Sequence, residues 1–298
     1  MTDCVLGIDF GGTKIALATA DAQGKILVRD NLPTPHHADE AVKVALHAAR
    51  EIIRRTEDET GCTPSRIGVA TMGITREDRV DLAPNVPGWE TLRLPDRLRQ
   101  ALAPAKVAIA NDVKCAALAE VTWGALCGLD PGLFINLGTG IAAALVVGGR
   151  VVTGAHQASG EIAYNPLTPD DIQGVRDHVA PLELRVGGGP LKHRAEQELG
   201  WQLSAGDLFR RWHTDPEIRR WLEPDLKQLA YQLTHLVIAL DPARVVVGGG
   251  LVAVRDVIFP YLNRYFERFV PYPPELVPAF YERDAGLMGA IALALSDS

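Results

Sequence analysis

Residues suited to phosphate chemistry gather near the beginning of the chain, where an apolar run ends in a carboxylate and a glycine-rich turn. The turn consists of Gly11, Gly12 and Thr13 and lies between Asp9 and Lys14. Glycine adopts backbone dihedrals closed to other residues and leaves N–H groups open to an approaching anion. A carboxylate at a strand end can hold hydrated Mg²⁺ beside substrate phosphates. The same residues also fit a tight hairpin capped by Asp9, so this stretch alone leaves both interpretations open.

Two further glycine-rich turns follow apolar runs later in the chain. They are Gly138, Thr139 and Gly140 between the runs 133–137 and 141–147, and Gly248, Gly249 and Gly250 after the run 244–247. None of the turns matches the phosphate loop of P-loop proteins or the dinucleotide turn of Rossmann folds. A strand–turn–strand unit that recurs in each half indicates a duplicated, two-lobed fold.

The elements that must position these turns follow from hydrophobic periodicity and from the placement of glycine and proline. In the first half, strands are predicted at 5–10, 15–20, 26–30, 67–71 and 106–110, with helices over 38–59 and after Asp112. In the second half, strands are predicted at 133–137, 141–147, 151–153 and 244–247, and helices at 205–213, 216–239, after the turn 248–250, and at 285–295. Residues 165–190 are rich in proline, glycine and aspartate and predict a loop. A new unit is expected to open near residue 130.

The composition is that of a soluble globular protein large enough for two domains. Hydrophobic residues make up 47% and charged residues 22%, and no apolar run reaches the roughly 20 residues that a membrane span needs. The net charge of −7 argues against nucleic acid as a partner, because that would require a basic face. The chain runs directly into its first strand, which leaves no room for a signal peptide. Four scattered cysteines, three of them in apolar contexts, predict reduced, buried thiols in a cytoplasmic protein.

Taken in order, the motifs closely resemble those of the actin-like sugar-kinase superfamily, and most closely those of its ROK family of bacterial sugar kinases. The motifs that carry the resemblance are Gly7–Lys14, Ala83–Trp89, Asn111–Asp112, Leu137–Ile141, Gly160–Ile162 and Val247–Leu251. The resemblance implies an α/β, two-lobed, actin-like (ribonuclease H-like) ATPase fold with duplicated mixed-sheet domains and a cleft between them. We expect an N-terminal lobe over 1–120, onto which a C-terminal helix at about 285–298 packs back, and a larger lobe over 121–284.

The resemblance also implies a role for each motif in ATP-dependent phosphorylation of a sugar hydroxyl, expected to be the primary 6-hydroxyl of a hexose. Asp112 is expected to be the general base, and its alternative role is the N-cap of a helix that follows a strand. Asp9 is expected to orient Mg²⁺ through water. The expected sugar-binding residues are Asn85, Asn111, Asp112, Glu161, Tyr164 and Glu183, although Glu183 also fits a solvated loop. The expected ATP-binding residues are Asp9, Gly11, Gly12, Thr13, Lys14, Gly138, Thr139, Gly140 and, at the adenine or ribose, Gly248, Gly249 and Gly250.

The chain departs from the family pattern where the acceptor sugar is bound. In that pattern, Gly-Glu-Ile is followed by Gly-His and then by Cys-x-Cys-Gly-x-x-Gly-Cys, and the His with three Cys binds a structural zinc ion. Here Tyr164 replaces the His and residues 165–190 contain no cysteine. We expect no zinc, because a tetrahedral site needs four N or S ligands. With ATP and Mg²⁺ as cofactors, we expect a less common hexose-like substrate, such as an amino sugar or cyclitol, with glucose kept open.

Other functions within the same superfamily are alternatives to a kinase. A repressor of the family would carry a DNA-binding helix-turn-helix, for which the few residues before the first motif leave no room. A sugar-binding sensor that has lost catalysis is disfavoured by the presence of Asp9, Asp112 and both phosphate turns. An actin-like or chaperone-like protein is disfavoured by the short chain. By analogy with relatives, a homodimer or homotetramer is expected, with no nucleic-acid or membrane partner.

Overall fold

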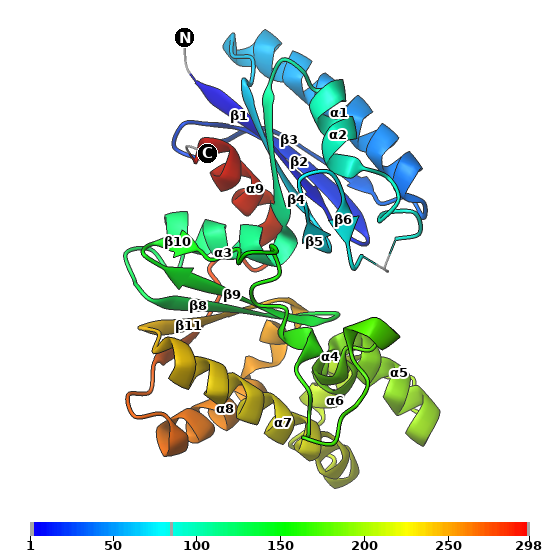
Figure 1. Ribbon diagram of the computed structural model, residues 1–298, viewed down its shortest axis with the longest axis vertical. Coiled ribbons are helices and arrows are strands. Elements are labelled where there is room, and N and C mark those ends of the chain that lie inside the picture. Colours follow the sequence, from blue (N-terminus) through cyan, green and yellow to red (C-terminus); the bar gives the residue numbers. More distant parts are fainter. Residues whose placement is uncertain (1–2, 84–85, 297–298) are drawn as a thin grey trace. The chain divides into compact units, whose positions relative to one another are not determined.

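The computed structural model describes residues 3–83 and 86–296 and divides the chain into two compact units (Figure 1). Unit 1 consists of the chain up to Trp123, residues Thr153–Ala158 and the segment from Asp284 onward. Unit 2 consists of Gly124–Val152 and Ser159–Arg283. The C-terminal segment therefore belongs to the same unit as the N-terminal strands.

The sheet of unit 1 has the strand order β3-β2-β1-β4-β7. Its strands are β1 (Cys4–Phe10), β2 (Lys14–Asp21), β3 (Ile26–Pro33), β4 (Arg66–Thr71) and β7 (Lys106–Asn111). β1, β2 and β3 pair antiparallel, whereas β1, β4 and β7 run parallel, with Phe10 opposite Thr71 and Thr71 opposite Asn111. The carboxyl ends of β1 and β7 therefore lie at the same edge of the sheet, where ligands of open α/β sheets bind. A short hairpin of β5 (Ile74–Thr75) and β6 (Val80–Asp81) follows β4.

Helices cover both faces of the unit 1 sheet. On one face, α1 (Ala38–Thr60) and α2 (Leu94–Ala101) share a hydrophobic core with β1, β2 and β4. On the other, shown in Figure 1 by the red helix, α9 (Ala285–Leu295) contacts β1, β4 and α3 (Asp112–Trp123). A Cβ on Gly68 would lie 1.8 Å from the Ala290 carbonyl oxygen, and one on Gly289 would lie 1.9 Å from that of Cys115. The small residues of α9 and its neighbours are therefore explained by close backbone approach.

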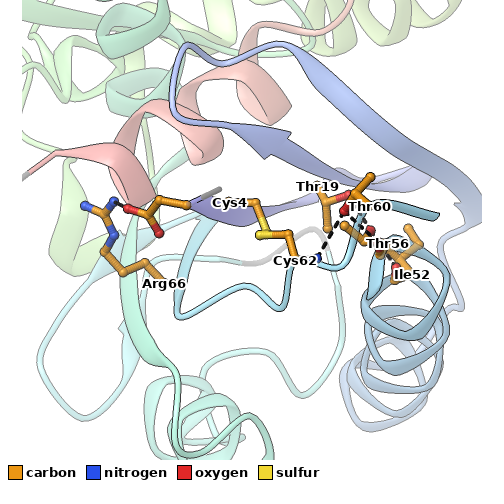
Figure 2. Close-up of a disulfide and its surroundings, with 8 residues drawn as sticks. Cys4, Thr19, Ile52, Thr56, Thr60, Cys62 and Arg66 are labelled. Carbon is orange, nitrogen blue, oxygen red and sulfur yellow. Dashed lines mark hydrogen bonds and ion pairs between the residues drawn. A yellow bond between two sulfur atoms is a disulfide. The ribbon is translucent and has the colours of Figure 1, made fainter. Parts of the chain in front are cut away.

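The prediction of reduced cysteines is wrong for the pair Cys4 and Cys62, which form a disulfide in unit 1 (Figure 2). Cys4 begins β1 and Cys62 follows the end of α1, and their Cα atoms are 6.3 Å apart. Figure 2 also shows the adjacent hydroxyls of Thr19 and Thr56, which are hydrogen-bonded at 2.7 Å and tie β2 to α1. The two cysteines are 58 positions apart in the chain, so their pairing depends on how α1 folds back over the sheet and could not be read from their spacing. Among the described residues, the free cysteines are Cys115, which is buried, and Cys127, which is exposed.

The sheet of unit 2 repeats the design of the first, with the order β10-β9-β8-β11-β12. Its strands are β8 (Gly132–Leu137), β9 (Ile141–Val147), β10 (Arg150–Val151), β11 (Arg244–Gly248) and β12 (Glu275–Pro278). β8 and β9 form an antiparallel hairpin, while β8, β11 and β12 run parallel. In both sheets a hairpin closed by a glycine turn is followed by parallel strands on the far side of its first strand. The predicted duplication of mixed sheets is confirmed.

Unit 2 is richer in helix than the sequence pattern predicted. Its helices are α4 (Pro181–Val186), α5 (Gly188–Leu199), α6 (Ala205–Arg210), α7 (Pro216–Leu240) and α8 (Arg255–Phe269), with 3₁₀ turns η1 (Ile162–Tyr164), η2 (Val175–Asp177) and η3 (Gly250–Val254). The predicted loop over 165–190 is wrong in its last third, because α4 and the start of α5 lie there. Pro181 suits a first helical turn, and Leu182 and Val186 are buried in the unit 2 core, so tertiary packing stabilises this short helix.

None of the helices in residues 3–83 and 86–296 has the length and apolar character needed to cross a membrane.

Candidate active site

Asp9 is the penultimate residue of β1, and its side chain is largely buried. Burial raises the pKa of Asp9 from 3.8 to about 7, the negative charge of Asp112 adds to the rise, and Lys14 opposes it. Within the described part of the chain, no donor is hydrogen-bonded to its carboxylate. A carboxylate that is costly to ionise and has no donor fits a bound cation, which would stabilise its charged form.

The turn Gly11–Thr13 joins β1 to β2 and is largely exposed. The Gly11 N–H donates to the Lys14 carbonyl at 3.1 Å, and the Thr34 hydroxyl donates to the Gly11 carbonyl at 2.7 Å. A Cβ on Gly11 would lie 2.9 Å from the Lys14 carbonyl oxygen, whereas a Cβ on Gly12 would meet no atom of the described residues within 4 Å. Among the described residues, no acceptor pairs with the N–H groups of Gly12 and Thr13. The turn therefore presents two N–H groups to an anion.

Three residues next to Asp9 and Lys14 were missed by sequence reasoning. Arg29 of β3 donates two hydrogen bonds, at 2.8 and 2.6 Å, to Asp284, and Lys14 Nζ lies 3.9 Å from the same carboxylate. Hydrogen bonding from Arg29 lowers the pKa of Asp284. A Cβ on Gly286, in the first turn of α9, would lie 2.6 Å from Asp9 Oδ2. Because Arg29 and Asp284 are 255 positions apart, only the small-residue composition of α9 hinted at this packing.

Asn111 ends β7 and Asp112 begins α3. The Asn111 Oδ1 accepts the N–H groups of Val113 and Lys114 at 2.9 and 3.2 Å, and its Nδ2 donates to the Gly73 carbonyl at 3.0 Å. Asp112 is partly exposed and accepts the Val113 N–H at 2.9 Å. Burial raises the pKa of Asp112, against the lowering effects of backbone N–H groups and Lys114. Asn111 therefore performs most of the capping that was the alternative role for Asp112.

The turn between β8 and β9 is hydrogen-bonded to the first residues of α5. Gly138 donates its N–H to the Gly140 carbonyl at 3.0 Å, which closes the turn. The N–H groups of Gly188 and Gly189 donate to the carbonyls of Gly138 and Thr139 at 3.0 and 2.9 Å. The helix thus fixes the turn through its backbone, and a Cβ on Gly188 would lie 2.7 Å from the Gly138 carbonyl oxygen, so this close approach favours glycine.

Glu183, the predicted second acidic sugar ligand, lies on α4 beside this turn. Its Oε2 accepts the Ile141 N–H at 3.1 Å, and a Cβ on Gly140 would lie 2.0 Å from the same oxygen. Burial raises the pKa of Glu183, while the Ile141 N–H lowers it. The alternative of a solvated loop position is wrong, because Glu183 is on a helix and braces the turn. A sugar contact remains a prediction for its other oxygen.

Glu161 and Tyr164 follow a glycine that packs directly on β9. Gly160 has a φ of +84°, and a Cβ there would lie 1.9 Å from the Ala143 carbonyl oxygen. The Ala143 N–H donates to the Gly160 carbonyl at 2.8 Å. Glu161 precedes η1, and Tyr164 within it packs partly against the unit 2 core. Asn85, the remaining predicted sugar ligand, lies outside the described residues.

Gly248 ends β11 and Gly249 and Gly250 follow it, and the surroundings of the three glycines differ. A Cβ on Gly248 would lie 2.6 Å from the Phe134 ring, and one on Gly249, at a φ of +88°, would lie 2.4 Å from the Leu137 carbonyl oxygen. Packing within unit 2 therefore already requires glycine at both positions. Among the described residues, no atom beyond the neighbouring chain lies within 4 Å of a Cβ built on Gly250. Of the three, Gly250 has the space in which a ligand would fit.

Each unit thus brings together part of the predicted set. In unit 1, Asp9 interacts electrostatically with Lys14 and Asp112, beside the turn Gly11–Thr13. In unit 2, Glu183 is held against the second glycine turn. Unit 1 thus presents two carboxylates with raised pKa, and a cation ligand and a partly exposed base are the groups that phosphoryl transfer to a hydroxyl requires.

Residues 5–297 match the sequence pattern of the ROK family. The chain belongs to the ROK family. Its first motif lies at the beginning of the match, and α9 lies within the end of it. The predicted family resemblance is therefore confirmed over almost the whole chain.

Similar ROK proteins are named as sugar kinases. The N-acetylgalactosamine kinase AgaK of Shewanella sp. (strain ANA-3) is 31% identical over 269 residues, covering 85% of this chain and 83% of the relative. The N-acetylmannosamine kinase of Shigella flexneri is 29% identical over 295 residues, covering 97% and 98%. The crystal structure of a ROK hexokinase from Thermus thermophilus matches with a TM-score of 0.82 at 30% identity, covering 98% of this chain and 97% of that one. The predicted fold and the resemblance to sugar kinases are confirmed.

Proposed function

We propose that this ROK protein is an ATP-dependent kinase that phosphorylates a hydroxyl, the primary 6-hydroxyl, of a hexose-like sugar. The observation that carries the proposal is the junction of β7 and α3, where Asn111 caps the helix and the Asp112 carboxylate is partly exposed. The relatives named as sugar kinases support the same activity.

In the proposed reaction, the sugar hydroxyl oxygen bonds to the γ-phosphorus of ATP while the bond from that phosphorus to the β–γ bridging oxygen breaks and ADP leaves. The hydroxyl proton passes to the Asp112 carboxylate. A carboxylate is too weak a base to ionise an alcohol beforehand, so the proton moves late, as the new bond forms. The raised pKa of Asp112 makes it a better acceptor. Positioned proton transfer of this kind contributes about 10²–10⁴-fold.

Phosphate binding is assigned to the two glycine turns. The N–H groups of Gly12 and Thr13, with the hydroxyls of Thr13 and Thr139, donate to phosphate oxygens, and Lys14 adds positive charge. Mg²⁺, when bound, neutralises charge on the β- and γ-phosphates. Asp9 fits this ion because it is a buried carboxylate without a donor among the described residues, and it would hold the ion through water.

We further propose an N-acetylated amino hexose as the preferred sugar. Two of the similar proteins are named N-acetylgalactosamine kinase and N-acetylmannosamine kinase. Tyr164 stands where the family pattern has a sugar-contacting histidine, and one changed hydrogen-bonding contact can redirect specificity. The remaining sugar contacts are assigned to Asn111, through its second Nδ2 hydrogen, to Glu161 and to the free oxygen of Glu183.

Steady-state kcat/KM on a panel of N-acetylated hexosamines, glucose and cyclitols tests the proposal. We expect at least one N-acetylated hexosamine to exceed glucose by at least about tenfold. The variant Tyr164→His restores the family residue and should shift the ratio toward glucose. A wild-type preference for glucose by orders of magnitude would refute the amino-sugar assignment, and absence of ADP release with every sugar would refute the kinase assignment.

We also propose a cytoplasmic homodimer or homotetramer, on the basis of the family resemblance. Multi-angle light scattering on the purified protein should give two or four times the mass of one chain. A monomer at the concentrations used in kinetic assays would contradict this assignment.

A further inference from the structure

One face of α7 carries three polar residues that point into unit 2. Asp225, Gln228 and Gln232 are spaced by three and four positions, so they lie on one side of the helix. Asp225 is 2% exposed and Gln232 is 9% exposed. Burying a polar group costs free energy unless the group is hydrogen-bonded. We call Asp225, Gln228 and Gln232 the α7 polar row, and their hydrogen-bond and ion-pair partners identify the segments that this row holds in place.

The two glutamines hold the chain directly after η1. Gln232 Nε2 donates to the Pro166 carbonyl at 2.8 Å, and Asn165 Nδ2 donates to Gln232 Oε1 at 3.2 Å. Gln228 Nε2 donates to the Leu167 carbonyl at 3.2 Å. Three consecutive residues without regular structure are therefore fastened to a long helix immediately after Tyr164.

Asp225 holds α4 and α5. Arg194 of α5 donates a hydrogen bond to Asp225 Oδ2 at 3.0 Å and another to the Arg185 carbonyl at 3.2 Å. Arg185 of α4 forms an ion pair with Asp225 Oδ1 at 2.8 Å, in a geometry outside that of a hydrogen bond. Figure 1 shows α4 close to α7. Because Arg185 is two positions after Glu183 on α4, the ion pair between Arg185 and Asp225 fixes the helix that carries Glu183.

The energetics of Asp225 favour a role in placement over a role in stability. Burial raises the pKa of Asp225 more than Arg194 and Arg185 lower it, so ionising this carboxylate is costly in the folded protein. Buried ion pairs of this kind are often no more stabilising than apolar residues of the same size. In several proteins, however, they select one conformation of the packed elements over others.

The segment held by the α7 polar row is the one that the ROK pattern stabilises with zinc. The donor set here does not fit a zinc ion, because residues 165–190 contain no cysteine and a single histidine, His178. In the described residues, no group of three or more His, Cys, Asp or Glu side chains is placed to hold a metal.

We propose that the α7 polar row replaces the structural zinc of the family pattern and positions Glu161, Tyr164 and Glu183 for the acceptor sugar. Gln228 and Gln232 fix the exit of η1, and Asp225 fixes α4 through Arg185 and Arg194. Its members are positioning residues, since they act through the segment that they hold. The kinetic part of the proposal rests on the proposed sugar-kinase function.

The variant Gln232→Met tests the proposal, because methionine keeps the side-chain volume and removes both hydrogen bonds. We expect faster amide hydrogen exchange in peptides covering 165–168 and a sugar KM raised about tenfold, with the ATP KM changed by less than about twofold. Asp225→Asn should accelerate exchange in 181–187 as well. The matched control is Lys227→Ala, on the same helix, which removes only an exposed ion pair with Glu223 and should change neither readout.

Unchanged exchange in 165–168 for Gln232→Met would overturn the anchoring role. Accelerated exchange with an unchanged sugar KM would overturn the positioning role. A rise in the wild-type sugar KM with the zinc-selective chelator TPEN would show that a metal performs this function and would also overturn the proposal. If the wild type phosphorylates no sugar, the proposed function fails, while the exchange data still decide the anchoring role.

Discussion

Asp9 is a carboxylate whose ionisation the surrounding residues make costly. Its pKa is raised from 3.8 to about 7, first by burial and then by the charge of Asp112. A raised pKa in the folded protein means that folding favours the protonated form of Asp9. The contribution of Asp9 to the free energy of unfolding is therefore complete below pH 3.8 and is lost as the pH rises to about 7. Above that pH the protein carries a charge that Lys14 compensates in part and that a bound cation would compensate further.

Asp9→Asn should therefore stabilise the metal-free protein at pH 8 and leave its stability nearly unchanged at pH 4. The interval between 3.8 and about 7 corresponds to at most about 4 kcal/mol. Urea unfolding at the two pH values, with EDTA present, measures the difference. Asp207→Asn is the control with the opposite expected sign, because hydrogen bonds from Ser204 and Arg210 lower the pKa of Asp207 to about 2. Loss of this carboxylate should therefore destabilise the protein at pH 8. Equal stability of Asp9→Asn and wild type at pH 8 would contradict the cost assigned to Asp9.

Gly286 sets the position of the same carboxylate, since a Cβ there would lie 2.6 Å from Asp9 Oδ2. Gly286→Ala should raise the Mg²⁺ concentration required for half-maximal activity and lower kcat by about 10²-fold, because a displacement near 1 Å is costly in an active site. Gly174→Ala is the matched control, since a Cβ at that position would meet no atom within 4 Å in the part of the chain that the structure describes. A Gly286→Ala enzyme with wild-type Mg²⁺ dependence would show that Asp9 can move without consequence.

Among the elements, the strands with strong apolar runs were predicted well, whereas the short helices α2 and α4 were not predicted. The strand Ile141–Val147 and the helix Ala285–Leu295 have the predicted bounds, because periodicity and flanking glycine are local signals. α2 was not predicted. Residues 165–190 were predicted as a loop, because the formation of α4 depends on burial of Leu182 and Val186 in a core made by residues distant in the chain. Local composition contains no information on such packing.

The Cys4–Cys62 disulfide joins the start of β1 to the end of α1 and closes a segment of 58 positions. Reduction should lower the free energy of unfolding by about 4 kcal/mol, according to the loop-entropy estimate. Urea unfolding with and without dithiothreitol measures this loss. The Cys62→Ser variant should show no effect of the reductant, and Cys127→Ser, which removes an exposed free thiol, should behave as wild type.

A wild-type unfolding curve that dithiothreitol leaves unchanged would show that the disulfide is absent or without effect. In a reducing cytoplasm the disulfide would be reduced. The stabilisation is therefore measured on the purified, oxidised protein.

At the scale of the whole molecule, duplication was the most informative sequence feature. The same order of hairpin and parallel strands in both sheets places a glycine turn at the end of β1 and again at the end of β8. The turns were recognised from the sequence because glycine and threonine follow an apolar run in both halves of the chain. The residues that support them, Arg29, Asp284 and Gly286 in unit 1 and Asp225 in unit 2, were not recognised, because their partners are distant in the chain and their residue types are ordinary.

We propose that this ROK protein transfers phosphate from ATP to a sugar with Asp112 as base. The most direct measurement is sugar-dependent ADP release by wild type and Asp112→Asn on the preferred N-acetylated hexosamine. Asparagine retains an acceptor for the Val113 N–H, so the start of α3 should be preserved. We predict that kcat falls by about 10²–10⁴-fold while the sugar KM changes by less than about threefold. Wild-type turnover by Asp112→Asn would contradict the account.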